Sequence, residues 1–239
     1  MATWRELAAK SLSTANIRRI DESAVRDYGM NSLVLMENAA LQASGWLLDK
    51  FRFPPQVLIL CGRGNNGGDG FAMARQLKAA GWPVKIAVPC PIETMSADAA
   101  ANRRILCAGE SATSVDCIEV DAVASDCQAR VMQWIDEAEV IIDAMLGTGA
   151  GGAPREPLAG WIRAANRVRA MRVAVDIPTG LDAETGRCAD PTFQAEVTLS
   201  FAARKRAFDV PAAREVTGEV VVLPIGIPSL LIDAALNWD

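Results

Sequence analysis

The chain has 239 residues, of which 51% are hydrophobic and 22% are charged, and its formal net charge is −5. This composition is typical of a folded α/β domain and excludes a disordered chain, while the acidic balance weighs against nucleic acid as a partner. No run of about 18 consecutive apolar residues occurs, so we expect no membrane partner. The six cysteines include no C-x-x-C pair, so we expect free thiols and a cytoplasmic location.

Two helical patterns come first along the chain. Apolar residues at three- and four-residue spacing predict helices over 13–28 and 31–49. Asn31 or Ser32 is a suitable N-cap for the second helix, and Gly29 between the two is a suitable C-cap for the first.

Short apolar runs then alternate with amphipathic stretches. The predicted strands are 57–61, 84–88, 117–120, 139–143, 172–176, 196–201 and 219–223, and the predicted helices are 69–80, 96–108, 122–136 and 157–167. Strands that alternate with helices indicate βαβ units, a mainly parallel central sheet and helices on both faces. Residues 202–218 are expected to be loop, and 224–228 a final turn before a tail. We therefore expect a single α/β domain over 1–239, with an N-terminal helical preface (1–52) and a Rossmann-like core (56–228).

The most informative segment is VLILCGRGNNGGDG at residues 57–70. A buried strand, a glycine-rich turn and a helix present backbone N–H groups to a phosphate. The spacing of Gly62, Gly64 and Gly67 fits the dinucleotide fingerprint, but the next strand ends at 89–91 in Pro-Cys-Pro, without the acidic residue that would hold a ribose. This argues against a conventional nicotinamide dehydrogenase. The plainer alternative is that the glycines only make a tight turn.

Two later strands also end in glycine-rich turns that carry a carboxylate, at Asp143 and at Asp176. The carboxyl ends of parallel strands share one edge, where open α/β sheets bind ligands, so the three turns predict one pocket. Asn66, Asp143 and Thr179 supply hard oxygen ligands, which suit an alkali or alkaline-earth cation. In the plainer alternative, each aspartate caps a helix or an Asx-turn. Lys205 lies in a short basic cluster that is expected to be a solvated loop or a phosphate contact.

Four motifs follow one another at compatible spacings: GxGNNGGDG, DAMLGTG, APRE and VDIPTGLDAETG. Together they strongly resemble the YjeF N-terminal domain family of NAD(P)H-hydrate epimerases, isomerases that interconvert the R and S forms of hydrated NADH and NADPH. The likeness runs from Glu37 to Pro228 and so covers nearly the whole chain. It implies a three-layer α/β/α Rossmann-like domain, often a homodimer, with a functional link to an ADP- or ATP-dependent NAD(P)H-hydrate dehydratase.

The resemblance also implies the site residues. The implied substrate contacts are Asn65, Asn66, Gly67, Gly68, Asp69, Gly147, Thr148, Gly149, Ala150, Gly151, Gly152, Ala153 and Asp176. The implied ligands of a potassium ion (K+) are Asn66, Asp143 and Thr179. Thr179 stands where the family more often has serine, and Lys205-Arg206-Ala207 stands where Lys-Pro-Gly is usual.

Because the chain contains no histidine, which excludes His-based triads and His-ligated zinc, we predict that Asp176 is the acid–base residue. Two alternatives stay open. The chain could be a non-catalytic scaffold of the same domain type that binds a nucleotide or a protein, or an enzyme that uses an ordinary nucleotide in the same pocket.

Overall fold

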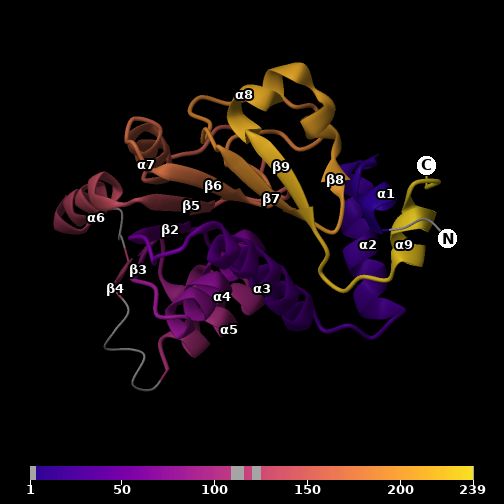
Figure 1. Ribbon diagram of the computed structural model, residues 1–239, viewed down its shortest axis with the longest axis horizontal. Helices are drawn as coiled ribbons and strands as arrows, with labels where there is room; N and C mark the ends of the chain where they lie inside the picture. The colour runs from indigo at the N-terminus through magenta and orange to yellow at the C-terminus, as the bar shows by residue number, and fades with distance from the viewer. Residues whose placement is uncertain (1–3, 109–115, 120–124, 239) are drawn as a thin grey trace.

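The computed structural model describes residues 4–108, 116–119 and 125–238, and one large parallel sheet lies at its centre (Figure 1). The strands of this sheet are β2 (Val57–Cys61), β3 (Val84–Val88), β4 (Asp116–Glu119), β5 (Val140–Ala144), β6 (Met171–Val175), β7 (Val197–Phe201) and β9 (Glu219–Leu223). In space they follow the order β4-β3-β2-β5-β6-β7-β9. The order reverses between β2 and β5, as in Rossmann-like domains, so the ligand crevice is expected at the carboxyl ends of these two strands.

Helices cover both faces of the sheet (Figure 1). One face carries α3 (Ser32–Lys50), α4 (Asn65–Ala79) and α5 (Ala97–Leu106), and the other carries α6 (Ser125–Glu137), α7 (Leu158–Ala165) and α8 (Arg214–Thr217). Phe71 of α4 and Trp161 of α7 are fully buried in the two layers between helices and sheet. Every residue of β2 and β5 is buried, which explains their unbroken apolar sequences. The predicted three-layer α/β/α fold is therefore confirmed.

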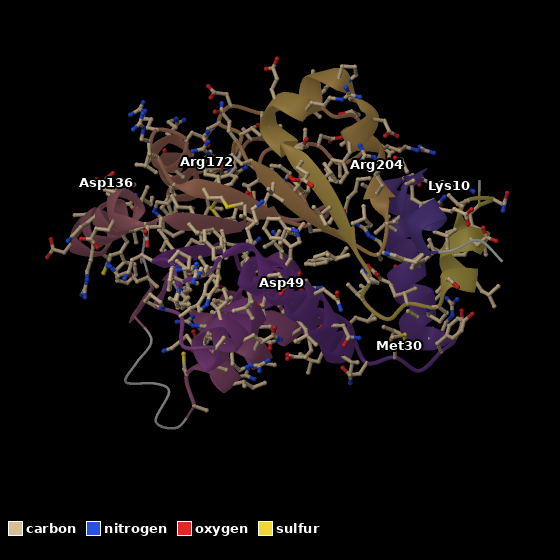
Figure 2. The ribbon with its side chains drawn as sticks, viewed as in Figure 1. Lys10, Met30, Asp49, Asp136, Arg172 and Arg204 are labelled. Carbon is tan, nitrogen blue, oxygen red and sulfur yellow. The ribbon has the colours of Figure 1, made fainter. Side chains whose placement is uncertain are left out.

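The N-terminal elements pack at one end of the sheet, beside both termini (Figure 1). They are α1 (Trp4–Ala8), β1 (Ser11–Leu12) and α2 (Thr14–Arg26), and α2 contacts the C-terminal helix α9 (Ser229–Ala235). Strand β1 pairs in parallel with β8 (Arg204–Lys205) as a separate two-stranded sheet. In Figure 2, Lys10 and Arg204 mark this end of the molecule and Asp136 the opposite end.

The sequence predicted most elements to within a few residues of their bounds. The helix expected over 31–49 is α3, and Asn31 is its N-cap, because its side chain accepts a hydrogen bond from the backbone N–H of Leu33 at 2.9 Å. Residues 120 and 122–124, assigned to a strand and a helix, lie outside the described residues. No helix in the described ranges combines the length and the apolar character that crossing a membrane requires.

Three expectations at the ends of elements were wrong. Helix α2 ends at Arg26 with Asp27 as its C-cap, so Gly29, with a φ of +68°, lies beyond the cap. Residues 202–218 are not loop, because they form β8, two short 3₁₀ turns and α8. Residues 224–228 were expected to be a final turn before a tail, and they lead instead into helix α9.

Helix α4 begins at Asn65, four residues earlier than predicted. Two of the glycines assigned to the turn therefore lie inside the helix, and a β-carbon on either would meet a neighbouring segment. A β-carbon on Gly67 would lie 1.9 Å from the carbonyl oxygen of Gly62, and one on Gly68 would lie 2.6 Å from the sulfur of Met36. Glycine is unfavourable in a helix interior, and here it allows α4 to pack closely against the first turn and α3.

Candidate active site

A cleft of about 670 Å³ lies at the carboxyl ends of the strands, where their order reverses. Its walls come from the first turn and the start of α4, from the loop after β5, and from helices α2 and α3. The predicted site residues that line it are Asn65, Asn66, Asp69, Gly147, Thr148, Gly149, Ala150 and Asp176. The three strand ends therefore meet in one pocket, as the parallel topology predicted. The volume falls in the range of roughly 300–1,000 Å³ that small-molecule sites occupy.

The remaining predicted residues lie around this cleft and not on its surface. Gly67 and Gly68 are buried within α4, and residues 151–153 form an exposed stretch of the loop after β5. Asp143 and Thr179 are completely buried and do not line the cleft. All of the substrate contacts that the resemblance implies stay predictions.

Asp143 and Thr179 join two of the strand ends. The Asp143 carboxylate accepts hydrogen bonds from the Thr179 backbone N–H and hydroxyl, both at 2.7 Å, and from the backbone N–H of Met145 at 3.1 Å. The Thr179 hydroxyl in turn accepts from the backbone N–H of Leu146 at 3.0 Å. Burial raises the pKa of Asp143 to about 6, although these hydrogen bonds oppose the shift. The bond to Met145, two residues on, is that of an Asx-turn, so the plainer structural role holds as well.

Asn66 is the polar group in this region that lacks a partner. The residue is 7% exposed, and neither its Oδ1 nor its Nδ2 has a hydrogen-bond partner among the described residues. A buried amide without partners is costly, so a bound group is expected to satisfy it. Across the described residues, no three His, Cys, Asp or Glu side chains are arranged to hold a metal. A cation at this position would depend on amide, hydroxyl and backbone oxygens and on at most two carboxylates among the described residues.

Asp176 forms a largely buried ion pair with Lys205. Asp176 follows β6 with a φ of +66°, a region that aspartate adopts more readily than most residues, and its backbone N–H donates to the Leu199 carbonyl at 2.7 Å. Its Oδ1 accepts a hydrogen bond from Lys205 Nζ, which also donates to Ser200 Oγ at 2.8 Å. The side chains of Lys205 and Asp176 are 1% and 18% exposed. The expectation of a solvated Lys205 was wrong, because pairing of β8 with β1 carries this lysine into the interior.

Two more carboxylates face this ion pair. Asp69 lies on α4 and Asp21 on α2, and both line the cleft. Burial raises the pKa of Asp69 well above its usual value, and the nearby charges of Asp176 and Asp21 raise it further. Asp21 keeps contact with water in the cleft, yet the surrounding protein displaces much of its hydration and raises its pKa to about 6, with Asp176 adding to the shift. Sequence reasoning missed Asp21, because this residue lies in the N-terminal helix and outside every motif.

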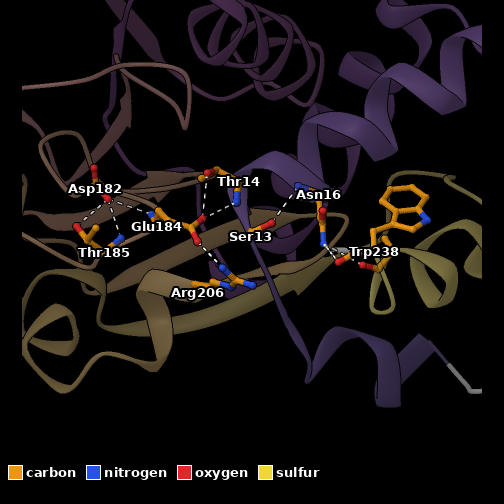
Figure 3. A network of polar contacts seen from close by, with 9 residues as sticks. Ser13, Thr14, Asn16, Asp182, Glu184, Thr185, Arg206 and Trp238 are labelled. Carbon is orange, nitrogen blue, oxygen red and sulfur yellow. Dashed lines mark hydrogen bonds and ion pairs between the residues drawn. The ribbon is translucent and has the colours of Figure 1, made fainter.

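A polar network outside the cleft fixes the start of α2 (Figure 3). Glu184 accepts hydrogen bonds from the backbone N–H and hydroxyl of Thr14 at 2.8 and 3.0 Å, and its other oxygen pairs with Arg206 at 2.6 Å. At the other side, Asn16 donates to the carbonyls of Ala235 and Trp238. The LDAETG motif therefore holds the start of α2 in place, and α2 is the helix that contributes Asp21 to the cleft.

The strand order and the charged cleft define a doubly wound α/β domain of the kind on which nucleotide-binding enzymes are built. More particularly, the chain belongs to the YjeF-related protein N-terminus family, whose model matches residues 32–207. Asp21 precedes the matched residues.

Individual relatives agree with this assignment. The chain is 38% identical over 221 residues to the NAD(P)H-hydrate epimerase of Rhodopirellula baltica. The aligned residues cover 92% of this chain and 86% of that protein. It is 42% identical over 202 residues to the bifunctional NAD(P)H-hydrate repair enzyme Nnr of Pyrobaculum aerophilum, covering 84% of this chain and 38% of that one. The crystal structure of yeast ynu0 shares the fold, with a TM-score of 0.74 at 22% identity over 90% of this chain and 88% of that chain.

Proposed function

We propose that this protein is an isomerase that epimerises the R and S forms of hydrated NADH and NADPH. The proposal rests on the relatives, whose names are NAD(P)H-hydrate epimerase and bifunctional NAD(P)H-hydrate repair enzyme. The observation that carries it here is the Asp176–Lys205 ion pair, which places an acid–base group in the cleft of a chain without histidine.

The reaction inverts a carbon that bears a hydroxyl beside the ring nitrogen. The hydroxyl leaves as water with assistance from the nitrogen lone pair, which gives a cationic ring, and water then adds to the opposite face. Asp176 exchanges the proton, and Lys205 orients its carboxyl group through a hydrogen bond. The carboxylates that line the cleft stabilise the cationic ring electrostatically.

We propose K+ as the cofactor, and Asn66 Oδ1, Asp143 and Thr179 are the residues that would hold it. The unpartnered Asn66 amide supports the fit, because K+ prefers uncharged and carboxylate oxygens. The ion would neutralise negative charge and position oxygens of the nucleotide. We expect a higher melting temperature in potassium than in lithium chloride at equal ionic strength, and Asn66→Ala should remove the difference. Equal melting temperatures of the unaltered protein in the two salts would reject the site.

The expected homodimer is also a proposal. Helix α3 presents exposed Val34, Leu41 and Leu48 at seven-residue spacing, so all three lie on one stripe of the helix. A second copy of the chain is the occupant that the family resemblance supports. We expect Leu41→Glu to convert a dimer into a monomer in sedimentation, and a wild-type chain that sediments as a monomer would reject the proposal.

We further propose a cytoplasmic protein whose product passes to an ADP- or ATP-dependent NAD(P)H-hydrate dehydratase. The bifunctional relative in Pyrobaculum aerophilum supports this link by its name. The free thiols at Cys90, Cys107, Cys127 and Cys188 suit a reducing compartment.

The decisive experiment couples the protein to an S-specific dehydratase in potassium buffer, with R-hydrated NADPH as substrate. We expect the protein to consume the R form faster than spontaneous epimerisation allows. Asp176→Asn should lose this acceleration, while Asp27→Asn, which alters an exposed carboxylate paired with Arg26, should keep it. If the wild-type protein gives no acceleration, the scaffold alternative is favoured.

A further inference from the structure

Asp69 is the carboxyl group of the cleft that has no bonding partner of its own. It is half-buried on α4, and no hydrogen bond or ion pair joins its side chain to any other described residue. It lies beyond the first turn of α4, where the helix dipole gives a carboxylate little support. The family resemblance implies only that Asp69 contacts the substrate, which leaves its chemical role open.

The cation near Asp69 is already engaged. Lys205 Nζ is bonded to the Asp176 carboxylate and to Ser200 Oγ. Asp21, Asp69 and Asp176 therefore share the field of one ammonium group that is committed to Asp176. Carboxylates that crowd together in this way resist ionising together, and the pKa is raised at Asp69, the member without a partner.

The other charged residues that line the cleft do not change this arrangement. They are Arg18, Glu22, Arg63 and Asp98. The charges that act on Asp69 are those of Asp176 and Asp21, which raise its pKa, and that of Lys205, which lowers it. Burial is the largest cause of the upward shift. A carboxyl group whose pKa is raised, facing a second carboxyl group that is bonded to an ammonium group, is the pattern of a general acid and a general base.

We propose that Asp69 is the general acid of the epimerisation. The Asp69 carboxyl group gives its proton to the departing hydroxyl while the carbon–oxygen bond breaks. The electron pair of that bond leaves with the oxygen, which departs as water. The lone pair of the ring nitrogen forms the carbon–nitrogen double bond. Water then adds to the other face, the nitrogen recovers its lone pair, and Asp176 takes the proton from the added water. Because Asp69 comes from α4 and Asp176 from the end of β6, the two carboxyls enter the cleft from different elements.

After one turnover Asp69 is ionised and Asp176 is protonated, which is the starting state for the reverse reaction. Exchange with solvent restores the first state, so no other reactant is needed. The assignment rests on the proposed epimerase activity and extends it to a second residue.

The test is Asp69→Asn. Asparagine has the size and neutrality of protonated aspartate and still donates a hydrogen bond, but it cannot give up a proton. We expect kcat to fall by roughly 10²–10⁴-fold, the usual contribution of a general acid, with little change in KM and no loss of thermal stability. A variant that keeps the wild-type kcat, whether or not KM rises, would show that Asp69 only binds substrate and would overturn the proposal.

The pH profile gives an independent test. A general acid must be protonated, so kcat/KM falls as pH rises through the pKa of Asp69. Asp21→Asn removes a negative neighbour, lowers that pKa, and should move this basic limb to lower pH. Asp27 is the C-cap of α2, the helix that also carries Asp21, and its carboxylate is paired with Arg26. Asp27→Asn should therefore leave the basic limb in place. An unmoved limb in Asp21→Asn would overturn the assignment. An inactive wild-type protein would instead reject the epimerase activity itself, so the two failures are distinguishable.

Discussion

Replacing Gly67 by alanine tests how closely α4 must approach the first turn. Measured by helix propensity alone, the substitution should stabilise the protein by about 1 kcal/mol, because glycine is unfavourable in a helix interior. The surroundings predict the opposite. The added β-carbon would lie 1.9 Å from the carbonyl oxygen of Gly62 and 2.6 Å from its carbonyl carbon.

The size of the effect follows from that overlap. Non-bonded heavy atoms stay roughly 3.5 Å apart, so the turn and the helix would have to separate by about 1.5 Å. Overpacking costs about 1–3 kcal/mol, and this site should lie at or above the upper end because the obstacle is main chain. After the gain in propensity, we expect a net loss of about 2 kcal/mol or more. In a chain of this size, such a loss lowers the melting temperature by about 4–8 °C.

Gly45→Ala is the matched control. Gly45 lies in the middle of α3, and no described atom of a neighbouring segment comes within 4 Å of the place that a β-carbon on it would take. We expect this variant to gain about 1 kcal/mol and to melt about 2–4 °C higher than the wild-type protein. Calorimetry and urea unfolding measure both variants. The reasoning is refuted if Gly67→Ala melts at or above the wild-type temperature while Gly45→Ala behaves as expected.

Three further predictions concern the ionised and hydrogen-bonded groups. Lys205→Met removes the ammonium of the buried ion pair, so it should abolish epimerisation and cost about 3–5 kcal/mol in urea unfolding, whereas Lys10→Met on the exposed surface should cost little. Thr179→Val deprives the buried Asp143 of a donor and should cost about 1–3 kcal/mol, while Thr179→Ser should be close to neutral; equal losses in both would contradict the role of the hydroxyl. The pKa of Glu184 is lowered chiefly by the backbone N–H of the residue that begins α2. Its contribution to stability is therefore present above the ordinary value of 4.5 and is lost as pH falls through the lower folded-state pKa. The protection factors of the α2 amides against hydrogen exchange should fall over that acidic range in the wild-type protein and should be lower at neutral pH in Glu184→Gln.

The sheet was predictable because its strands are covered on both faces. A strand buried in this way must be apolar throughout, so runs such as 57–61 and 139–143 mark strands without any knowledge of their neighbours. The Rossmann-like order then brings the ends of β2, β5 and β6 to one edge, which is why the turns after these strands line one cleft, as the sequence predicted.

The start of α4 was not predictable from local preference. A run with Gly67 and Gly68 has low helix propensity, and only the contacts with Gly62 and Met36 explain why those positions are glycine in a helix. Propensity describes a residue and its neighbours in sequence, whereas this constraint comes from segments packed against the helix.

The same limitation applies to Lys205 and Asp21. A lysine in a basic cluster is normally solvated, and its burial here depends on pairing with Leu12 near the other end of the sequence. Asp21 belongs to an amphipathic helix and to no motif, so its place opposite Asp176 arises only when α2 docks. Of the four ionisable residues Asp21, Asp69, Asp176 and Lys205, two, Asp21 and Lys205, therefore reach their positions only through long-range contacts.

Those long-range contacts have a consequence for biosynthesis. Thr14 is bonded to Glu184, 170 positions later, and Asn16 to Ala235, 219 positions later. At roughly 5–20 residues per second, a ribosome needs about 10–30 s to proceed from Thr14 to Glu184. During that interval the α2 wall of the cleft lacks both of these partners. A nascent chain that has completed β2, α4 and β5 can thus carry the glycine-rich turns of the site while it remains inactive, until the final portion of the polypeptide captures its N-terminal helix.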